Sequence, residues 1–473
     1  MKIPFVGADF RSAPVQFDPQ TCVNFYPVKG SDISKTTGYL APTPGLTSFS
    51  TNTGGSVRGL FHFNSVVYAV IDNTLYTINA AGTATSRGTL NSNTGRVSMT
   101  GNYTQICITD GTDMYTYTIS STVFAEVVDA DFVGGVDRIS YLDGYGVFTQ
   151  SDDIWLTDLN NFSSITATST ATPSIAADML VAAIPSHREL FIFGQHVTYV
   201  YWNSGATFPF EPREGILLDH GAAAAHAIVE VDNTLVWLSR NKEGNTVVVR
   251  ANGYTPQIIS DDALSQELGT YTTVSDAFAF SYSSQGHLFY VLTFPTENRT
   301  WVYDFVTKLW HQRSTRITNT PVEPFLRWKP NCYCFAFGKH LVGDDQSGNI
   351  YQISETTYTD NGTEIIRERI TPVISSDLAQ LCIDCLEVDM AVGEGLITGQ
   401  GSDPKLMLSI SKDGGQTWGS ELQLAVGDIG AYSTRVRLNS LGTARNWAFK
   451  FRTSDPIMWY LFGLEAKIRK GAH

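Results

Sequence analysis

Short apolar runs alternate with polar residues along most of the chain, and these runs come in sets of four. Residues 55–90 contain the segments VRGLFHF, SVVYAVID, TLYTINA and ATSRGTL, which are separated by Asn, Asp and Gly. Residues 95–129 repeat this arrangement with RVSMTGN, YTQICITD, DMYTYTIS and VFAEVVD. Period-two alternation bounded by turn residues predicts β-strands. Four strands within about forty residues form the unit of a β-propeller blade, so we predict a propeller.

The four-strand unit continues beyond these two blocks, at a spacing that widens from about 40 to about 50 residues. Candidate inner strands begin near Val57, Arg96, Val136, Val181, His226, Asp276 and Leu326. In the last set, LRWKPN, CYCFAFG and NIYQISE are predicted as the first, second and third strands. The pattern predicts seven blades, or six if a set at one end of the series is misassigned. The widening spacing indicates insertions, and one of them, ISDDALSQELGTY (259–271), is predicted to hold a short helix.

The segments that flank the predicted propeller (51–358) lack its regular pattern. Residues 1–50 are rich in Pro and in isolated aromatic residues, which predicts an extended N-terminal arm. The aromatic side chains of the arm either pack on another surface or cover the chain's own propeller, and the sequence favours neither. GLTSFS at the end of the arm is a candidate for the strand that completes the last blade and closes the ring.

The C-terminal part of the chain begins with a charged segment, residues 359–382, which is predicted to be a connector. Residues 383–473 then contain six alternating segments, LEVDMAVG, PKLMLSISKDGG, TWGSELQLAV, TRVRLNSLG, WAFKFRTSD and YLFGLEAKI. Six strands over this length are typical of a single β-sandwich. The predicted fold class is therefore all-β, with an arm, a propeller and a C-terminal sandwich.

The composition describes a globular protein that is poor in charge, with 42% hydrophobic and 16% charged residues. The net charge of −14 argues against a protein whose main role is to grip nucleic acid, because that role needs basic surface. An acidic surface is compatible with lining a passage through which DNA slides. The start of the chain lacks the apolar core of a signal peptide, and no run is long enough for a membrane span, so we expect no membrane anchor.

The residues that commonly carry chemistry are scattered. The nine histidines show no metal-ligand spacing and no Ser-His-Asp order, and no glycine-rich segment has the context of a phosphate-binding loop. Cys382 and Cys385 have CxxC spacing, but alternation in LCIDCLEVDM predicts that the two thiols lie on opposite faces of a strand. We therefore interpret them as structural thiols rather than a zinc or redox site. No catalytic, cofactor-binding or metal residue is expected.

One motif invites a specific interpretation. SKDGGQTW (411–418) fits the Asp-box pattern, in which Asp413 accepts hydrogen bonds from turn amides, Gly415 supplies a positive φ and Trp418 packs on the sheet. The residues of this structural hairpin are Ser411, Asp413, Gly415, Thr417 and Trp418. Sialidases combine such boxes with a propeller, but the box occurs once here and outside the predicted propeller.

A sialidase would also need three convergent arginines and a Tyr/Glu nucleophile pair. The arginines that are available, such as Arg58, Arg138, Arg188 and Arg250, have no spacing that brings them together.

Several short segments occur in one order along the chain. They are VNFYPV (23–28), GYLAPTPG (38–45), VRGL (57–60), GRVSM (95–99), and WAFKFR (447–452) followed by Pro456. In their order and in total length, the chain resembles the packaged-DNA stabilisation proteins, or tail hubs, of short-tailed bacteriophages. Between residues 150 and 380 the resemblance rests on the strand pattern alone.

The resemblance implies a structural protein of the virion tail, made in the host cytoplasm, that catalyses no reaction and needs no cofactor. It implies a homohexameric ring below the portal-adaptor ring, which extends and closes the DNA exit channel and stabilises packaged DNA. It further implies partners among tail spikes or fibres and a tail needle or plug, with channel DNA passing without sequence-specific binding. The candidate arm anchors are Phe5, Phe10, Phe17, Phe25 and Tyr26.

Two alternatives stay open from the sequence. One is a carbohydrate-directed propeller, either glycan-binding or sialidase-like, and the other is a receptor-binding tail adhesin.

Overall fold

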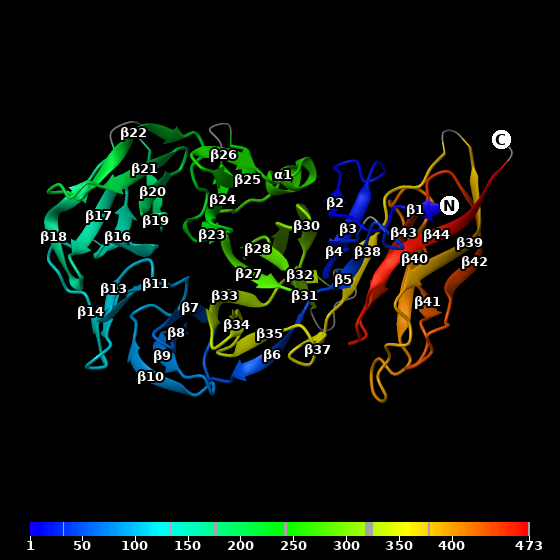
Figure 1. Cartoon of the computed structure of the whole chain (residues 1–473), viewed down its shortest axis with the longest axis horizontal. Coiled ribbons are helices and arrows are strands. Elements are labelled where there is room, and N and C mark those ends of the chain that lie inside the picture. Colours follow the sequence, from blue (N-terminus) through cyan, green and yellow to red (C-terminus); the bar gives the residue numbers. More distant parts are fainter. Residues whose placement is uncertain are drawn as a thin grey trace.

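The chain forms two all-β parts that lie side by side along its longest axis (Figure 1). The structure is a computed structural model that describes residues 1–31, 33–132, 134–173, 178–240, 244–316, 325–376 and 379–471. The larger part is a propeller, and the smaller part is a sandwich that holds both chain termini (Figure 1). The predicted all-β class, with a propeller and a C-terminal sandwich, is confirmed.

The propeller has seven blades, each a sheet with four antiparallel strands in the ring. Blade one is β7 (Val57–Phe63), β8 (Val66–Ile71), β9 (Thr74–Ile78) and β10 (Ala84–Thr89). Blade two is β11 (Ser98–Gly101), β12 (Gln105–Thr109), β13 (Met114–Thr118) and β14 (Val123–Glu126). Blade three is β15 (Ile139–Leu142), β16 (Tyr145–Gln150), β17 (Asp153–Asp158) and β18 (Asn161–Ala171).

Blades four to seven continue around the ring. Blade four is β19 (Leu180–Ser186), β20 (Glu189–Gly194), β21 (Thr198–Asn203) and β22 (Phe210–Leu218). Blade five is β23 (Val229–Val231), β24 (Thr234–Arg240), β25 (Thr246–Asn252) and β26 (Thr255–Ile258). Blade six is β27 (Phe278–Ser284), β28 (His287–Phe294), β29 (Arg299–Asp304) and β30 (Leu309–Gln312). Blade seven is β33 (Pro330–Ala336), β34 (Lys339–Asp344), β35 (Ile350–Ser354) and β6 (Gly45–Ser50).

The predicted ring closure and the predicted helix are both present. β6 is the segment GLTSFS, and it pairs antiparallel with β35, with Gly45 opposite Ser354. The helix α1 (Asp262–Leu268) follows blade five, and Asp261 caps it by accepting a hydrogen bond from the Leu264 amide at 2.8 Å. A short 3-10 helix, η1 (Ala225–Ala227), precedes β23.

The strand assignment predicted for blade seven is wrong. LRWKPN is not the inner strand, because β32 (Phe325–Arg327) pairs with β31 (Ser314–Arg316) in a separate two-stranded sheet. The inner strand is β33, which contains most of the segment predicted as second. Phe337 and Gly338, with φ of 55° and 71°, reverse the chain directly after β33. This turn makes β34, which the pattern missed, the second strand.

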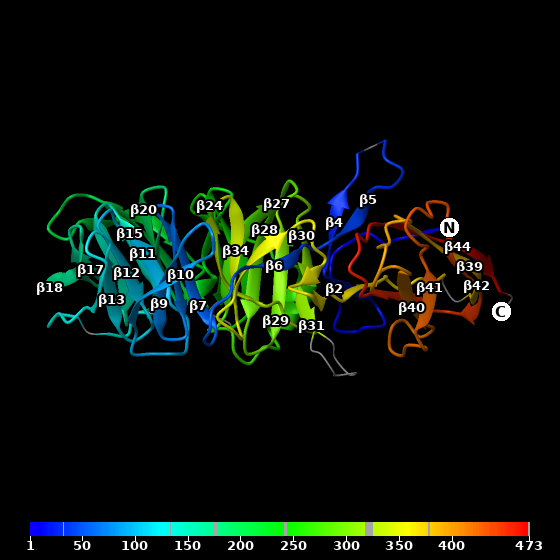
Figure 2. The same cartoon turned by 90° about the horizontal axis from the view of Figure 1, so that it is seen from below.

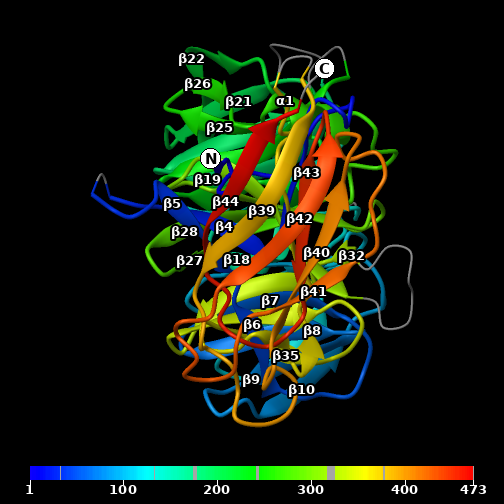
Figure 3. The same cartoon turned by 90° about the vertical axis from the view of Figure 1, so that its right-hand side faces the viewer.

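The sandwich contains all six predicted C-terminal strands together with strands from the N-terminal arm. One sheet has the order β4 (Phe25–Lys29), β5 (Gly38–Pro42), β44 (Leu461–Lys470), β39 (Leu381–Met390) and β42 (Val436–Ala444), with β1 (Lys2–Ile3) also on β44. The other has β3 (Pro19–Val23), β38 (Arg367–Ile370), β43 (Ala448–Thr453), β40 (Lys405–Ser411) and β41 (Leu422–Ala425), with β2 (Phe10–Arg11) on β3. Figure 3 shows these long strands face-on.

The segment predicted as a connector carries three short strands. β36 (Thr359–Asp360) and β37 (Thr363–Glu364) extend the sheet of blade seven, and β38 lies in the sandwich. All four residues of β38 are buried although three of them are charged. Arg369 is satisfied by the carbonyl oxygens of Phe5, Ala8 and Thr21, at 2.8, 2.8 and 3.1 Å. The charged side chains of β38 are therefore buried, and Arg369 binds the arm.

The two parts share one sheet. β3 pairs in parallel with β30 of blade six at Val23 and Gln312, and antiparallel with β38 on its other side. The sheet of blade six thus runs without interruption into the sandwich. Figure 2 shows the β4–β5 hairpin extending outward from this junction.

Candidate functional site

The junction between propeller and sandwich centres on Asn24, a buried residue with φ of 55° between β3 and β4. Its Nδ2 donates to the carbonyl oxygens of Ser314 at 2.9 Å and Ile366 at 2.7 Å, and its Oδ1 accepts from the Ser314 amide at 2.9 Å. Its backbone amide donates to Gln312 O at 2.9 Å. Asn24 therefore joins the arm to blade six through its backbone amide, and to β31 and the segment before β38 through its side chain. Asn tolerates this conformation better than most residues.

A buried carboxyl group lies beside this junction. Asp9 accepts from the Cys22 amide at 2.7 Å and from Gln312 Nε2 at 3.3 Å. Burial raises the pKa of Asp9 to about 7, which hydrogen bonding from Cys22 only partly offsets. The charge state of this part of the arm is therefore sensitive to pH near neutrality.

The five candidate arm anchors divide into two groups. Phe5, Phe25 and Tyr26 are buried in the chain's own cores, and Phe5 packs edge-on against Phe451 with ring centroids 5.3 Å apart. Phe10 is half-buried in β2. Phe17 is 76% exposed, at a turn in which its amide donates to Pro14 O. Contact with another subunit therefore stays a proposal for Phe17 and, in part, for Phe10.

The Asp-box hairpin supports the turn that carries Phe17. Asp413 Oδ1 accepts from Ser411 Oγ at 2.6 Å and from the Thr417 amide at 3.0 Å, and Gly415 has φ of 92°. Burial opposes ionisation, but hydrogen bonds led by those from Ser411 and Thr417 lower the pKa of Asp413 to about 2. Lys450 Nζ lies 4.7 Å from the ring centroid of Trp418.

The two glycines of the Asp-box turn pack directly on the arm. A Cβ on Gly414 would lie 3.3 Å from Gln16 O, and one on Gly415 would lie 2.8 Å from Pro19 Cβ. The hairpin and the arm therefore fit together only because these positions lack a side chain.

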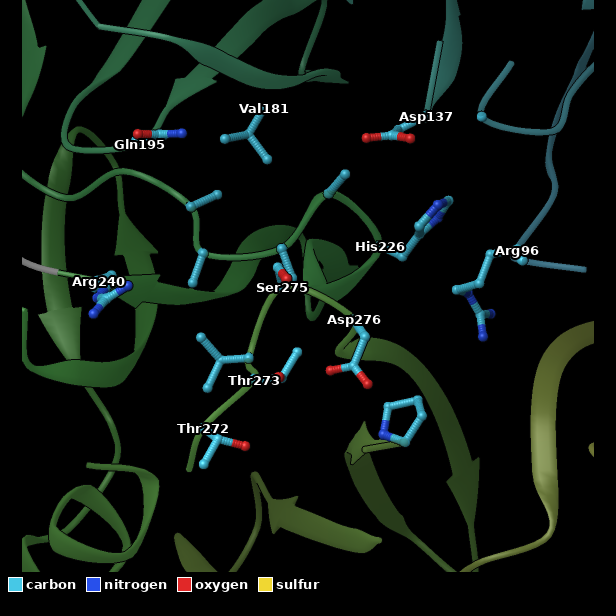
Figure 4. A pocket seen from close by; sticks show the side chains of 18 of the residues that line it. Arg96, Asp137, Val181, Gln195, His226, Arg240, Thr272, Thr273, Ser275 and Asp276 are labelled. Atoms are coloured by element: carbon cyan, nitrogen blue, oxygen red, sulfur yellow. The ribbon is translucent and has the colours of Figure 1, made fainter. Parts of the chain in front are cut away.

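A cavity of about 1190 Å³ opens at one end of the propeller, and residues from all seven blades line it. It lies where the chain enters the inner strands, as Ser56, Arg96, Asp137, His226, Asp276 and Asn331 illustrate. A second cavity of about 340 Å³ shares Arg96 and His226 with the first and adds Arg138. Figure 4 shows His226 and Arg96 near one another, with Asp137 and Asp276 on either side.

The arginines considered for a sialidase-like site do not converge. Arg58 is buried in a cage of backbone carbonyls that includes Ser92 O at 2.8 Å. Arg188 and Arg250 pair with Asp143 and Asp232 at 3.4 and 3.0 Å. Of these four arginines, only Arg138 lines one of the two cavities, the smaller one.

The sequence analysis named Arg96 and His226 as the starts of inner strands but did not single them out as site residues. Their positions at the starts of inner strands are the one signal that could have placed them near the propeller axis.

The prediction that Cys382 and Cys385 face opposite sides of a strand is wrong. The register of β39 shifts between Ile383 and Cys385, which marks a β-bulge at Asp384. Leu381, Ile383 and Leu386 are buried, whereas both cysteines are half-buried and free. The extra residue places both thiols on the side away from the sandwich core.

No group of three or more His, Cys, Asp or Glu side chains that could hold a metal ion occurs among the residues that the structure describes. Within the same residues, no helix is long and apolar enough to cross a membrane.

A seven-bladed propeller that shares a sheet with a C-terminal sandwich defines a large all-β protein of two joined parts. Residues 1–358 match the Phage_stabilise family model, described as Bacteriophage P22 Gp10, beta-propeller. Residues 366–469 match the model described as Bacteriophage P22 Gp10, beta-sandwich. The chain belongs to the bacteriophage P22 Gp10 family, and it is a phage structural protein.

The other comparisons are less informative. No curated protein matches the chain. Among solved structures, a chain of the Mitotic Checkpoint Complex is 13% identical, with coverage of 69% of this chain and 95% of that chain and a TM-score of 0.41. The N-terminal domain of Nup159 is 12% identical, with 70% and 97% coverage and a TM-score of 0.38. The extracellular domain of a one-component system from B. thetaiotaomicron is 9% identical, with 82% and 48% coverage and a TM-score of 0.44. At these values the similarities carry no argument about function.

Proposed function

We propose that this chain is a subunit of the tail hub that lies below the portal-adaptor ring, where it extends and closes the DNA exit channel and stabilises the packaged genome. The observation that carries the proposal is membership of the P22 Gp10 family over both the propeller and the sandwich. In this proposal the protein acts as a scaffold and not as an enzyme.

The shared sheet suits a part that bears load. Backbone hydrogen bonds from β30 through β3 to β38 join the propeller to the sandwich without a flexible linker. A hub that retains DNA under pressure needs such a stiff connection, because a hinge at this place would let its two parts move independently.

The acidic balance supports a conduit for DNA. With a net charge of −14, the protein repels the phosphate backbone more than it attracts it. A channel of this character lets DNA slide without sequence-specific binding, since tight binding would require basic surface and the release of counterions.

Two exposed apolar side chains on the N-terminal arm support contact with a neighbour. Phe17 is 76% exposed beside the Asp-box hairpin, and Ile33, which the sequence analysis did not single out, is 96% exposed on the β4–β5 hairpin. Large apolar side chains at the tips of projecting segments are suited to bury against a partner. We assign these segments to contacts within a homohexameric ring and with the adaptor ring, and we assign the outer faces of the propeller and the sandwich to spikes or fibres and to the needle.

The DNA content of particles assembled without this protein tests the proposal. We expect heads to fill and then to lose their genome over hours, while particles with the protein keep it. Particles that stay full but cannot adsorb to cells would overturn the proposal and favour a receptor-binding tail adhesin. Adding the purified protein back to freshly filled heads provides the control, because it restores retention only if the hub itself closes the exit.

A further inference from the structure

Three basic side chains line the two cavities of the propeller. Arg96 and His226 line both the larger cavity and the smaller one, and Arg138 lines the smaller one. They come from the starts of blades two, three and five, so the ring brings together residues that are far apart in the sequence. We call these three residues the axial basic cluster.

The two guanidinium groups are held in place but incompletely bonded. Arg138 Nη1 donates to the carbonyl oxygens of Ala225 at 2.7 Å and Ile228 at 2.9 Å. The Arg138 side chain is half-buried and lines the smaller cavity. Arg96 lies 3.8 Å over the ring of Phe278, and its Nη1 reaches Asn331 Oδ1 only at 3.4 Å. Its Nε is buried with no hydrogen-bond partner.

Five acidic residues also line the two cavities, and three of them are bonded to groups outside this cluster. Asp276 Oδ2 accepts from the Thr296 amide at 2.8 Å, and Asp345 pairs with Arg327 at 2.8 Å. Asp110 accepts from the turn amides of Thr112 and Asp113 at 3.0 and 2.8 Å. Asp137 and Glu230 line the cavity walls and are exposed. In the part of the chain that the structure describes, neither Arg96 nor Arg138 forms an ion pair.

The cluster keeps a net positive charge at neutral pH. Burial lowers the pKa of Arg96 and of Arg138 to about 10, so both stay protonated. Burial, together with the charges of Arg96 and Arg138, lowers the pKa of His226 well below its usual value. The imidazole is therefore neutral, and it can donate one hydrogen bond beside two charged donors.

We propose that the axial basic cluster binds a small oxyanion, a phosphate or carboxylate group. Guanidinium groups bind such groups through paired, charge-assisted hydrogen bonds, which are about twice as strong as neutral ones. The smaller cavity, of about 340 Å³, has the size of a small-molecule site. The ligand supplies the direct ion pairs that Arg96 and Arg138 lack among the described residues.

Isothermal titration calorimetry on the full chain, with sodium phosphate and separately with sodium citrate, tests the proposal. We expect saturable binding of at least one anion with a Kd at or below about 1 mM. Phosphate binding alone assigns a phosphoryl ligand, and preferential citrate binding assigns a carboxylate. The Arg138→Gln substitution is expected to weaken binding at least about tenfold, because it removes a charged donor from the smaller cavity.

Two matched variants keep the test decisive. Arg240 lines the same wide cavity but is exposed, so Arg240→Gln is expected to change the Kd less than about twofold. Arg138→Lys keeps the charge but loses the fork of donors, and intermediate binding is expected if the variant melts like the wild type. No saturable heat with either anion overturns the proposal, as does an equal loss of binding in Arg240→Gln and Arg138→Gln.

Discussion

The first five blades and the last two are built in different ways. Each of the first five is made from four strands that follow one another in the chain. Blade seven takes its outer strand, β6, from the N-terminal arm, and blade six gains β3 of the arm at its edge. Both blades are thus fastened by residues that are far away in the sequence, as the pairing of Gly45 with Ser354 shows.

This difference means that the first five blades are stabilised mainly by contacts between consecutive strands, whereas the last two also depend on contacts with the arm. A blade made of consecutive strands closes only short loops, whereas the last two blades need the arm to return across the whole propeller. We infer that the arm and the last two blades form one cooperative unit that also includes the sandwich. The predictions below test where that unit begins and ends.

The largest effect is expected from Asn24→Ala at the junction. The substitution removes the side-chain bonds to Ser314 and Ile366 and places Ala at φ of 55°, so we expect a loss of about 3–5 kcal/mol in the free energy of unfolding. Asn160 is the matched control, because it has φ of 56° in blade three and is exposed. Asn160→Ala is expected to cost about 1 kcal/mol in denaturant titrations. Equal costs would refute a special role of the junction.

A second prediction compares two fully buried leucines. Leu46→Ala in β6 and Leu75→Ala in β9 are each expected to cost about 2–5 kcal/mol. Hydrogen exchange should distinguish them. We expect Leu46→Ala to speed exchange throughout blade seven and the arm, and Leu75→Ala to act mainly within blade one. The same exchange pattern in both variants would show that the propeller opens as a single unit.

A third prediction concerns pH. Because burial raises the folded-state pKa of Asp9 to about 7, the folded state binds this proton more tightly than the unfolded state. The stabilisation is present in full at low pH and is lost as pH rises toward 7, at up to about 1.4 kcal/mol per pH unit.

Asp9→Asn is expected to reduce this slope in denaturant titrations between about pH 4 and 7. Part of the slope should remain, because burial also raises the pKa of Asp360, to about 6. An unchanged slope would show that Asp9 is ionised in the folded protein.

The smallest effect on stability is expected from Phe17→Ser. The side chain is 76% exposed, so the free energy of unfolding should change by less than about 0.5 kcal/mol. Assembly, followed by light scattering, should weaken if Phe17 contacts a neighbour. Tyr103 is an exposed aromatic residue of the propeller, and Tyr103→Ser serves as the control. Assembly that is unchanged in Phe17→Ser would remove this residue from the proposed interface.

Regular alternation made most of the fold predictable. VRGLFHF and its counterparts specify inner strands through local pattern alone, and GLTSFS could be recognised as the closing strand because blade seven lacked an outer one. KHLVGD was missed because its strand, β34, has little alternation, and the turn at Phe337 and Gly338 gives a weak signal.

Features that depend on three-dimensional contacts were beyond the sequence. The charged residues of β38 indicated a connector, whereas Arg369 is buried among carbonyl groups of the arm. A single bulge at Asp384 was enough to turn Cys385 to the same side as Cys382. Arg96 and His226 come together only because the ring closes. The angle between successive blades, which brings them together, cannot be deduced from the spacing of residues along the chain.

The uninterrupted sheet from blade six to the sandwich has a mechanical consequence. A pull on the sandwich along its strands reaches the propeller through β3, first across its pairing with β38 and then across its pairing with β30 at Val23 and Gln312. The hydrogen bonds within one pairing lie across the direction of such a pull. Neighbouring bonds therefore share the force and are not opened one at a time.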